Sequence, residues 1–208
     1  MYNNWHFVHI VQYDIQCKHL FMSNGTDHIA RSAISVVSRY GIRKATMGDV
    51  AAAAGVSRQT LYNTYANKDQ VIQAAIRYVT DSGIRDVHKA WDNSPNLSEQ
   101  LDRFFEIGPL SWFDLVQSSP DAADLIDGLN LAGGEELAKG AARWTDALES
   151  LFQPYADTLE SKGVTAKGVA ELVYTSSHSA KTGSGDRTQL AGRLKTLKQS
   201  ILSLVNEI

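Results

Sequence analysis

The stretch DVAAAAGVSRQTLY, residues 49–62, constrains the fold more than any other segment of the chain. Its four alanines favour a helix, and Gly55 tolerates the positive φ with which a chain leaves a helix abruptly. Ser57 is a good N-cap for a second helix. Ala51 lies four residues before the glycine, where only a small side chain lets two helices approach closely. The stretch therefore predicts two short helices joined by a tight turn, a helix-turn-helix.

Helical spacing of apolar residues extends over most of the chain after Met22, and no alternating run there indicates a strand. Glycines that end helices, and Ser and Thr residues that cap them, divide this pattern into segments. The predicted helices are 29–40, 47–54, 57–65, 67–89, 97–107, 110–117, 121–131, 135–160 with a disturbance at Pro154, 165–180 and 187–206. The predicted fold class is all-α, with a three-helix helix-turn-helix domain over residues 22–70 and a larger helical domain over residues 71–208.

Residues 1–21 differ in composition from everything that follows, and WHFVHIVQYDI suits a strand or a helix equally well. Met22 begins a short polar lead into the first predicted helix. We therefore expect residues 1–21 to be an amino-terminal extension outside the core fold. Four side chains in it could in principle bind a transition metal, but their spacing matches no closed site, and we expect no metal: His6, His9, Cys17 and His19.

The charge is distributed unevenly. The whole chain carries a formal charge of -3, whereas residues 27–70 contain six Lys or Arg against three Asp. A small basic module joined to a larger acidic body suits a protein of which only one part meets a polyanion. The single cysteine excludes an internal disulfide, and no apolar run approaches the roughly 20 residues of a membrane span. We expect a cytoplasmic protein with no membrane partner.

The second helix of the helix-turn-helix carries side chains that suit a DNA groove. Residues three and four apart share a helix face, so this helix exposes Arg58, Gln59, Tyr62 and Asn63 together. Arginine can bridge two acceptors of guanine, and glutamine or asparagine can pair with adenine, each pair discriminating by about 1–3 kcal/mol. Side chains at the helix ends are placed to hold phosphates, which set the register without reading sequence: Thr46, Tyr65 and Lys68.

Residues 27–70 resemble the amino-terminal DNA-binding domain of the TetR family of bacterial repressors. The matching pieces are AISVVSRYGIRKATMGDVAAAAGVS, TLY and NKDQV. The resemblance implies major-groove contacts by Arg58, Gln59, Thr60, Tyr62 and Asn63. It also implies phosphate contacts by Thr46, Thr64 and Lys68.

Two residues depart from the family pattern. Tyr65 stands where phenylalanine is common, so we expect its ring to lie in the core with a polar tip. Gly48 offers no side chain at a position that sometimes touches a base. Because Gly48 cannot make this contact, we expect the chain to read fewer base pairs of each half-site than is usual in the family.

The resemblance further implies a homodimer on palindromic double-stranded operator DNA. A seam at alternating spacings of four and three runs along the last helix. Together with the apolar face of the helix before it, this seam could form a four-helix interface across a two-fold axis. The predicted interface residues are Val169, Leu172, Val173, Leu190, Leu194, Leu197, Ile201 and Leu204. The alternative is that this seam packs inside its own subunit.

The middle helices carry aromatic residues with a few polar neighbours, which suits a small-molecule pocket and suits a plain hydrophobic core equally well. The candidate ligand residues are Phe105, Trp112, Trp144, Tyr174 and His178. The resemblance implies a repressor that an effector of unknown identity releases, through a pivot of helix 68–89.

No motif for catalysis or cofactor binding accompanies these features. Cys17 has no nearby base, and neither a nucleophile elbow nor a phosphate-cradling glycine loop occurs in the chain. We therefore expect no enzyme, no catalytic residue and no cofactor. Two rival functions stay open at this point: a ligand-binding or adaptor protein with a vestigial DNA head, and a DNA-binding protein without a ligand.

Overall fold

The computed structural model describes residues 25–119 and 121–205, and no strand occurs in these ranges, so the predicted all-α class is confirmed. The expected extension at residues 1–21, and the metal site considered there, lie outside the described residues. Two short non-α elements are the π-helix η1 (Glu106–Leu110) and the 3-10 helix η2 (Gln153–Tyr155). The α-helices are α2 (Gly25–Tyr40), α3 (Met47–Ala54), α4 (Arg58–Thr64), α5 (Lys68–Trp91), α6 (Leu97–Phe105), α7 (Ser111–Ser118), α8 (Ala122–Phe152), α9 (Ala156–Ser161), α10 (Ala166–Thr182) and α11 (Arg187–Val205).

Contacts divide the described residues into two compact units. Unit 1 contains the residues up to Tyr78 together with Asp114–Gly133, and unit 2 contains Val79–Phe113 and the residues from Gly134 onward. Unit 1 thus extends the expected domain 22–70 by the first part of α5 and by the segment from α7 into α8. Three helices, α5, α7 and α8, contribute to both units.

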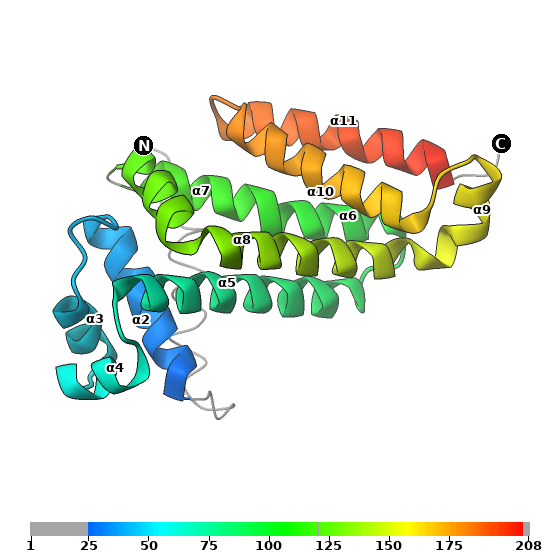
Figure 1. The fold of residues 1–208 in the computed structure, drawn as a ribbon. Coiled ribbons are helices and arrows are strands. Elements are labelled where there is room, and N and C mark those ends of the chain that lie inside the picture. The colour runs from blue at the N-terminus through cyan, green and yellow to red at the C-terminus, as the bar shows by residue number, and fades with distance from the viewer. Residues whose placement is uncertain (1–24, 120, 206–208) are drawn as a thin grey trace. The chain divides into compact units, whose positions relative to one another are not determined.

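Unit 1 is built around α2, α3 and α4. α3 contacts both of the other two helices (Figure 1). Gly41 ends α2 at a φ of 82°, and Thr46 begins α3 as the sequence predicts. The Thr46 side chain accepts from the amide of Asp49 while the Asp49 carboxylate accepts from the amide of Thr46, which forms a capping box. Two otherwise unpaired amides at the start of α3 are satisfied in this way.

The turn between α3 and α4 depends on Gly55, whose φ of 65° and ψ of 26° place it in the left-handed region. Its amide donates to the carbonyl of Ala52 at 3.2 Å, and the next amide, that of Val56, donates to Ala51 at 3.0 Å. These two bonds form the glycine-ended closure that halts a helix and sends the chain off in a new direction. Ser57 then caps α4 by accepting from the amide of Thr60.

The core of unit 2 joins residues from α5, α6 and α8 to the two last helices, α10 and α11, which lie side by side (Figure 1). Its largest fully buried side chain is Phe152, at the end of α8. The same core contains the fully buried residues Val87, Leu101, Leu148, Leu159, Val173, Leu190 and Ile201.

α8 differs from the prediction, since one helix of 31 residues covers the expected helix 121–131 and the first part of the expected helix 135–160, up to Phe152. The glycine pair at residues 133–134 does not break it. A Cβ at Gly133 would collide with Cδ1 of Ile76, so this glycine allows close packing against α5 within unit 1. α8 ends at Phe152 because Pro154 follows, and the chain continues through η2 into α9.

A membrane crossing needs more length and apolarity than any helix offers within residues 25–119 and 121–205.

Gly55 and Gly134 allow a matched test of the turn, because neither has any atom within 4 Å of the position that a Cβ would take. Gly55→Ala should lower the free energy of unfolding by about 1–2 kcal/mol, the strain of a left-handed non-glycine residue. Gly134→Ala, inside α8, should raise it by up to about 1 kcal/mol through helix propensity. Urea unfolding of both variants measures the two free energies. If both substitutions changed the free energy of unfolding in the same direction and by the same amount, this account of Gly55 would be contradicted.

Candidate nucleic-acid interface

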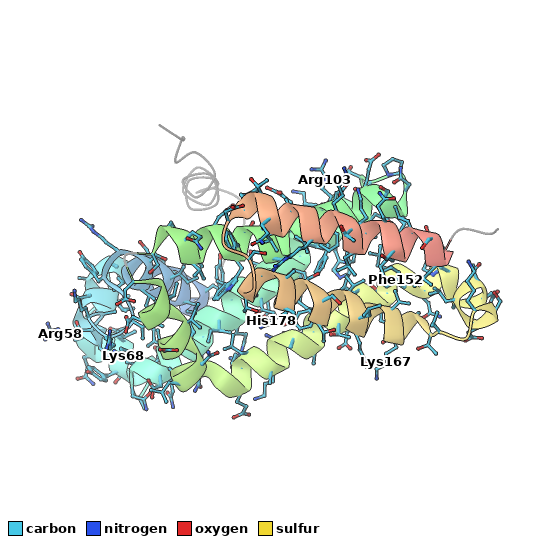
Figure 2. All side chains as sticks on the ribbon, turned by 90° about the horizontal axis from the view of Figure 1, so that it is seen from above. Arg58, Lys68, Arg103, Phe152, Lys167 and His178 are labelled. Atoms are coloured by element: carbon cyan, nitrogen blue, oxygen red, sulfur yellow. The ribbon has the colours of Figure 1, made fainter. Side chains whose placement is uncertain are left out.

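The exposed side of α4 carries the residues that were predicted to read bases. Leu61 is fully buried and anchors the helix, whereas Arg58, Gln59, Thr60, Tyr62, Asn63 and Thr64 are all exposed. Arg58 lies at the rim of unit 1 (Figure 2). One apolar anchor therefore holds α4 while nearly every other side chain of the helix stays available to a partner.

Hydrogen bonds within α4 restrain several of these exposed side chains. Gln59 Nε2 donates to Asn63 Oδ1 at 2.9 Å, so the two amides stay on one face. Thr64 Oγ1 donates to the carbonyl of Thr60 at 3.1 Å, and Thr60 Oγ1 lies 2.8 Å from Ser57 Oγ. The two threonines thus serve the first and last turns of the helix in this structure, while Gln59 and Asn63 form an exposed amide pair.

Thr46 and Asp49 form an exposed polar cluster at the start of α3. Thr46 Oγ1 donates to Asp49 Oδ2 at 2.6 Å. This side-chain hydrogen bond, with the one from the Thr46 amide, lowers the pKa of the Asp49 carboxyl, and the positive charge of Arg58 adds to the effect. Thr46 therefore already has an intrachain partner, although its exposure leaves it reachable by a phosphate.

Lys68 opens α5, and its side chain has partners within the chain. Its Nζ donates to the carbonyl of Ile42 at 2.9 Å and to that of Ala45 at 3.3 Å, and the residue is half-buried. Figure 2 shows it further from the rim of unit 1 than Arg58. Lys68 therefore holds the loop between α2 and α3 in this structure, and its contact with a phosphate stays a prediction. Tyr65 is half-buried, and burial raises the pKa of its hydroxyl.

The same loop is held on its other side by Asp124 from the first turn of α8, a residue that the sequence did not single out. Asp124 is buried and forms an ion pair with Arg43 Nε, and the Arg43 amide donates to its Oδ2 at 3.2 Å. Burial raises the pKa of this carboxyl, but the hydrogen bonds and the charge of Arg43 outweigh burial and lower it. A charged pair thus joins α8 to the loop that leads into α3.

The five candidate ligand residues fall into two groups within unit 2. Phe105 is buried beside Phe104, which makes an edge contact with Trp144 at 5.7 Å between ring centroids, so these rings belong to the core. Of the other three, Trp112 lies at the start of α7, while Tyr174 and His178 lie in the second half of α10.

Lys181 joins this second group and was missed by the sequence interpretation. Its Nζ lies 5.1 Å from the ring centroid of Trp112, and burial lowers its pKa to about 8. The rings of Tyr174 and His178 lie 6.2 Å apart, and burial also lowers the pKa of His178.

A separate open groove of about 580 Å³ lies between α5 and α8, lined by polar residues that include Asp81, Arg85, His88, Arg143, Asp146 and Ser150.

The predicted dimer seam packs mostly inside its own subunit, as the alternative interpretation held. Five of its eight residues are buried in the core of unit 2, because that face of each helix turns toward the helices of the same chain: Val169, Val173, Leu190, Leu194 and Ile201. Leu197 and Leu204 are half-buried, and Leu172 is 48% exposed. The exposed area that remains of the seam lies on the outward faces of α10 and α11.

Part of this chain is similar in sequence to known bacterial regulators, and most of it is similar in fold to solved structures. Residues 29–75 match the sequence family of bacterial regulatory proteins of the tetR type. No curated protein sequence matched the chain.

Solved structures share the fold over most of the chain. A putative TetR-family transcriptional regulator from a Rhodococcus species has a TM-score of 0.67 at 19% identity, covering 89% of this chain and 100% of its own. The fatty acid degradation regulator FadR from Bacillus halodurans has a TM-score of 0.61 at 15% identity, covering 88% and 97%. A TetR-family regulator from Pectobacterium atrosepticum gives 0.61 at 16%, covering 88% and 94%.

Lys68→Met separates the two roles considered for this side chain. The variant keeps an apolar stem and removes the donors to Ile42 and Ala45, so the free energy of unfolding should fall by about 1–3 kcal/mol. The slope of log affinity for DNA against log salt, to which each neutralised phosphate adds about 0.9, should stay unchanged. Lys167→Met, at an exposed position of α10, is the control. A flatter slope with unchanged stability would place Lys68 on a phosphate.

Proposed function

We propose that this chain, a member of the TetR family of bacterial transcriptional regulators, is a dimeric repressor that a small molecule releases from a palindromic operator. The family consists of DNA-binding regulators and not of enzymes. The proposal includes base reading by α4, the pairing of two copies and release by a ligand.

The observation that carries the proposal is the exposed, acid-free face of α4. No Asp or Glu occurs between Asp49 and Asp69, so nothing on this helix repels a phosphate backbone. Arg58 and the amide pair of Gln59 and Asn63 are exposed and belong to the side-chain types that recognise guanine and adenine in the major groove. Leu61 and the two capped ends hold the helix, so these groups meet DNA from a rigid support.

Pairing of two copies is supported by the size of the reading surface. One helix-turn-helix contacts too few base pairs to specify a single site in a genome, and two copies related by a two-fold axis double the number that is read. Of the predicted interface residues, Leu172, Leu197 and Leu204 keep exposed area on α10 and α11. We place the interface on this outward surface.

An effector site is supported by the group at α7 and α10 in unit 2. Trp112 and Tyr174 provide aromatic surface, while His178 and Lys181 provide polar groups beside it. α5 is one continuous helix shared by both units, so a change at its unit 2 end has a covalent path to the DNA-binding unit. The ligand can shift the equilibrium only by as much as its affinity differs between the two arrangements.

The reading role of Arg58 is tested with two duplexes: one that the protein selects from genomic fragments, and one of the same composition in scrambled order. Arg58→Ala should weaken binding to the selected duplex by about 1–3 kcal/mol, about 5- to 150-fold, because alanine cannot form the bidentate pair with a base. Binding to the scrambled duplex should change much less. Fluorescence anisotropy at constant salt measures both affinities.

Arg103→Ala is the matched control, since Arg103 is an exposed arginine of α6 in unit 2 (Figure 2). It should leave both affinities unchanged. Equal losses by Arg58→Ala on the two duplexes would assign Arg58 to the backbone, and no loss on either would remove it from the interface.

The location of the dimer interface is tested by a charge at an exposed leucine. Leu172→Asp should convert a dimer into a monomer at micromolar concentration, because the carboxylate would be buried without a partner at the interface. Leu131→Asp, at a leucine of α8 that is 91% exposed, should leave the oligomeric state unchanged. Multi-angle light scattering reads the mass of each variant, and a dimer that survives Leu172→Asp would move the interface elsewhere.

A further inference from the structure

Gly48, in the first turn of α3, lies against the side chain of Arg58 from α4. A Cβ at Gly48 would lie 2.7 Å from Nη2 of Arg58, 3.0 Å from its Cζ and 3.1 Å from its Nε. The first of these distances is shorter than real Cβ contacts reach, and the other two are tighter than most. The guanidinium therefore occupies the space that the side chain of any other residue at this position would fill.

Backbone conformation does not explain this glycine. The described glycines with positive φ are Gly41, Gly55 and Gly163, so the backbone at Gly48 would accept an alanine without strain. Glycine is also a poor helix former compared with alanine, and Gly48 stands inside a helix of only eight residues. The feature that alanine would disturb is the guanidinium of Arg58.

The surroundings also favour the guanidinium at this place. The amino-terminal end of a helix carries partial positive charge, which by itself disfavours a cation. Asp49, the next residue along α3, offsets it with a carboxylate that the Thr46 capping box holds in position. The positive charge of Arg58 contributes to lowering the pKa of this carboxyl. Backbone space at Gly48 and negative charge at Asp49 thus act on the same side chain.

We infer that Gly48 is a positioning residue for Arg58, whose guanidinium lies across the start of α3 and is already restricted in conformation before it meets a guanine in the major groove. An arginine free in solvent loses much rotamer freedom on binding, and a restricted one loses less. This inference rests on the proposed reading role of Arg58. On this inference Gly48 has no side chain that touches DNA, yet it affects how strongly Arg58 binds its base.

A double-mutant cycle tests the inference, using Gly48→Ala, Arg58→Ala and the double variant with the selected and scrambled duplexes. Gly48→Ala should weaken binding to the selected duplex about fivefold or more when Arg58 is present, and less than about twofold when Arg58 is already alanine. Its melting temperature should stay equal or rise, because the displaced group is the end of a flexible side chain and alanine favours the helix. Loss of affinity without loss of stability is the signature that a merely structural glycine would not give.

Gly134→Ala is the matched control, since it makes the same change in a helical glycine with open surroundings. It should leave DNA affinity unchanged. A second measurement needs no DNA: the NMR signal of the Arg58 Nε–H group in the DNA-free protein should shift in Gly48→Ala, as expected for a guanidinium released from α3.

Each other outcome overturns the inference in a recognisable way. Equal losses with and without Arg58 would mean that DNA itself approaches the backbone at Gly48. Tighter binding by Gly48→Ala would mean that the place over α3 competes with DNA for Arg58. Unchanged binding by Gly48→Ala, with a loss by Arg58→Ala, would refute the role of Gly48 and leave the reading role of Arg58 intact. Unchanged binding by Arg58→Ala would instead refute the proposed function of that residue.

Discussion

The closure of α3 at Gly55 is the interaction on which the DNA-binding unit depends. Two backbone hydrogen bonds, to Ala51 and Ala52, turn the chain within three residues and set the direction in which α4 leaves. That direction buries Leu61 and exposes nearly every other side chain of α4. It also brings Arg58, the first residue of α4, back over Gly48 in the first turn of α3. The left-handed backbone at Gly55 therefore sets the position of every side chain of α4 that is proposed to meet DNA.

Charged side chains fix the loop between α2 and α3, which leads into the helix-turn-helix. Lys68 donates to two carbonyls of the loop between α2 and α3, and Asp124 pairs with Arg43 of the same loop. The loop ends in Thr46, whose capping box orders the start of α3 and holds Asp49 beside Arg58. Groups that touch no base can thus influence recognition, because they fix the backbone from which the reading side chains project.

Local chemistry explains why some predictions held and others did not. The stops at Gly41 and Gly55 and the caps at Thr46 and Ser57 were readable because each depends on residues within one turn. Gly133 misled the prediction, since a glycine that breaks a helix and one that lets two helices pack look alike in a sequence. The leucine seam of the last helix misled it in the same way. An apolar stripe demands burial, but it does not say whether its own chain or a second copy provides the cover.

The sequence by itself determined that this chain is helical, that a tight turn separates two short helices near Gly55, and that the second of them is basic and polar, because propensity, capping and spacing act over a few residues. Only the tertiary structure decided what each long side chain does with its charged end. It directed Lys68 to the carbonyls of Ile42 and Ala45 and the guanidinium of Arg58 to Gly48. It also put Asp124 beside Arg43, 81 positions away. The physical reason is reach: a lysine or arginine extends over several ångströms, and its partner depends on which distant backbone the fold brings within that radius.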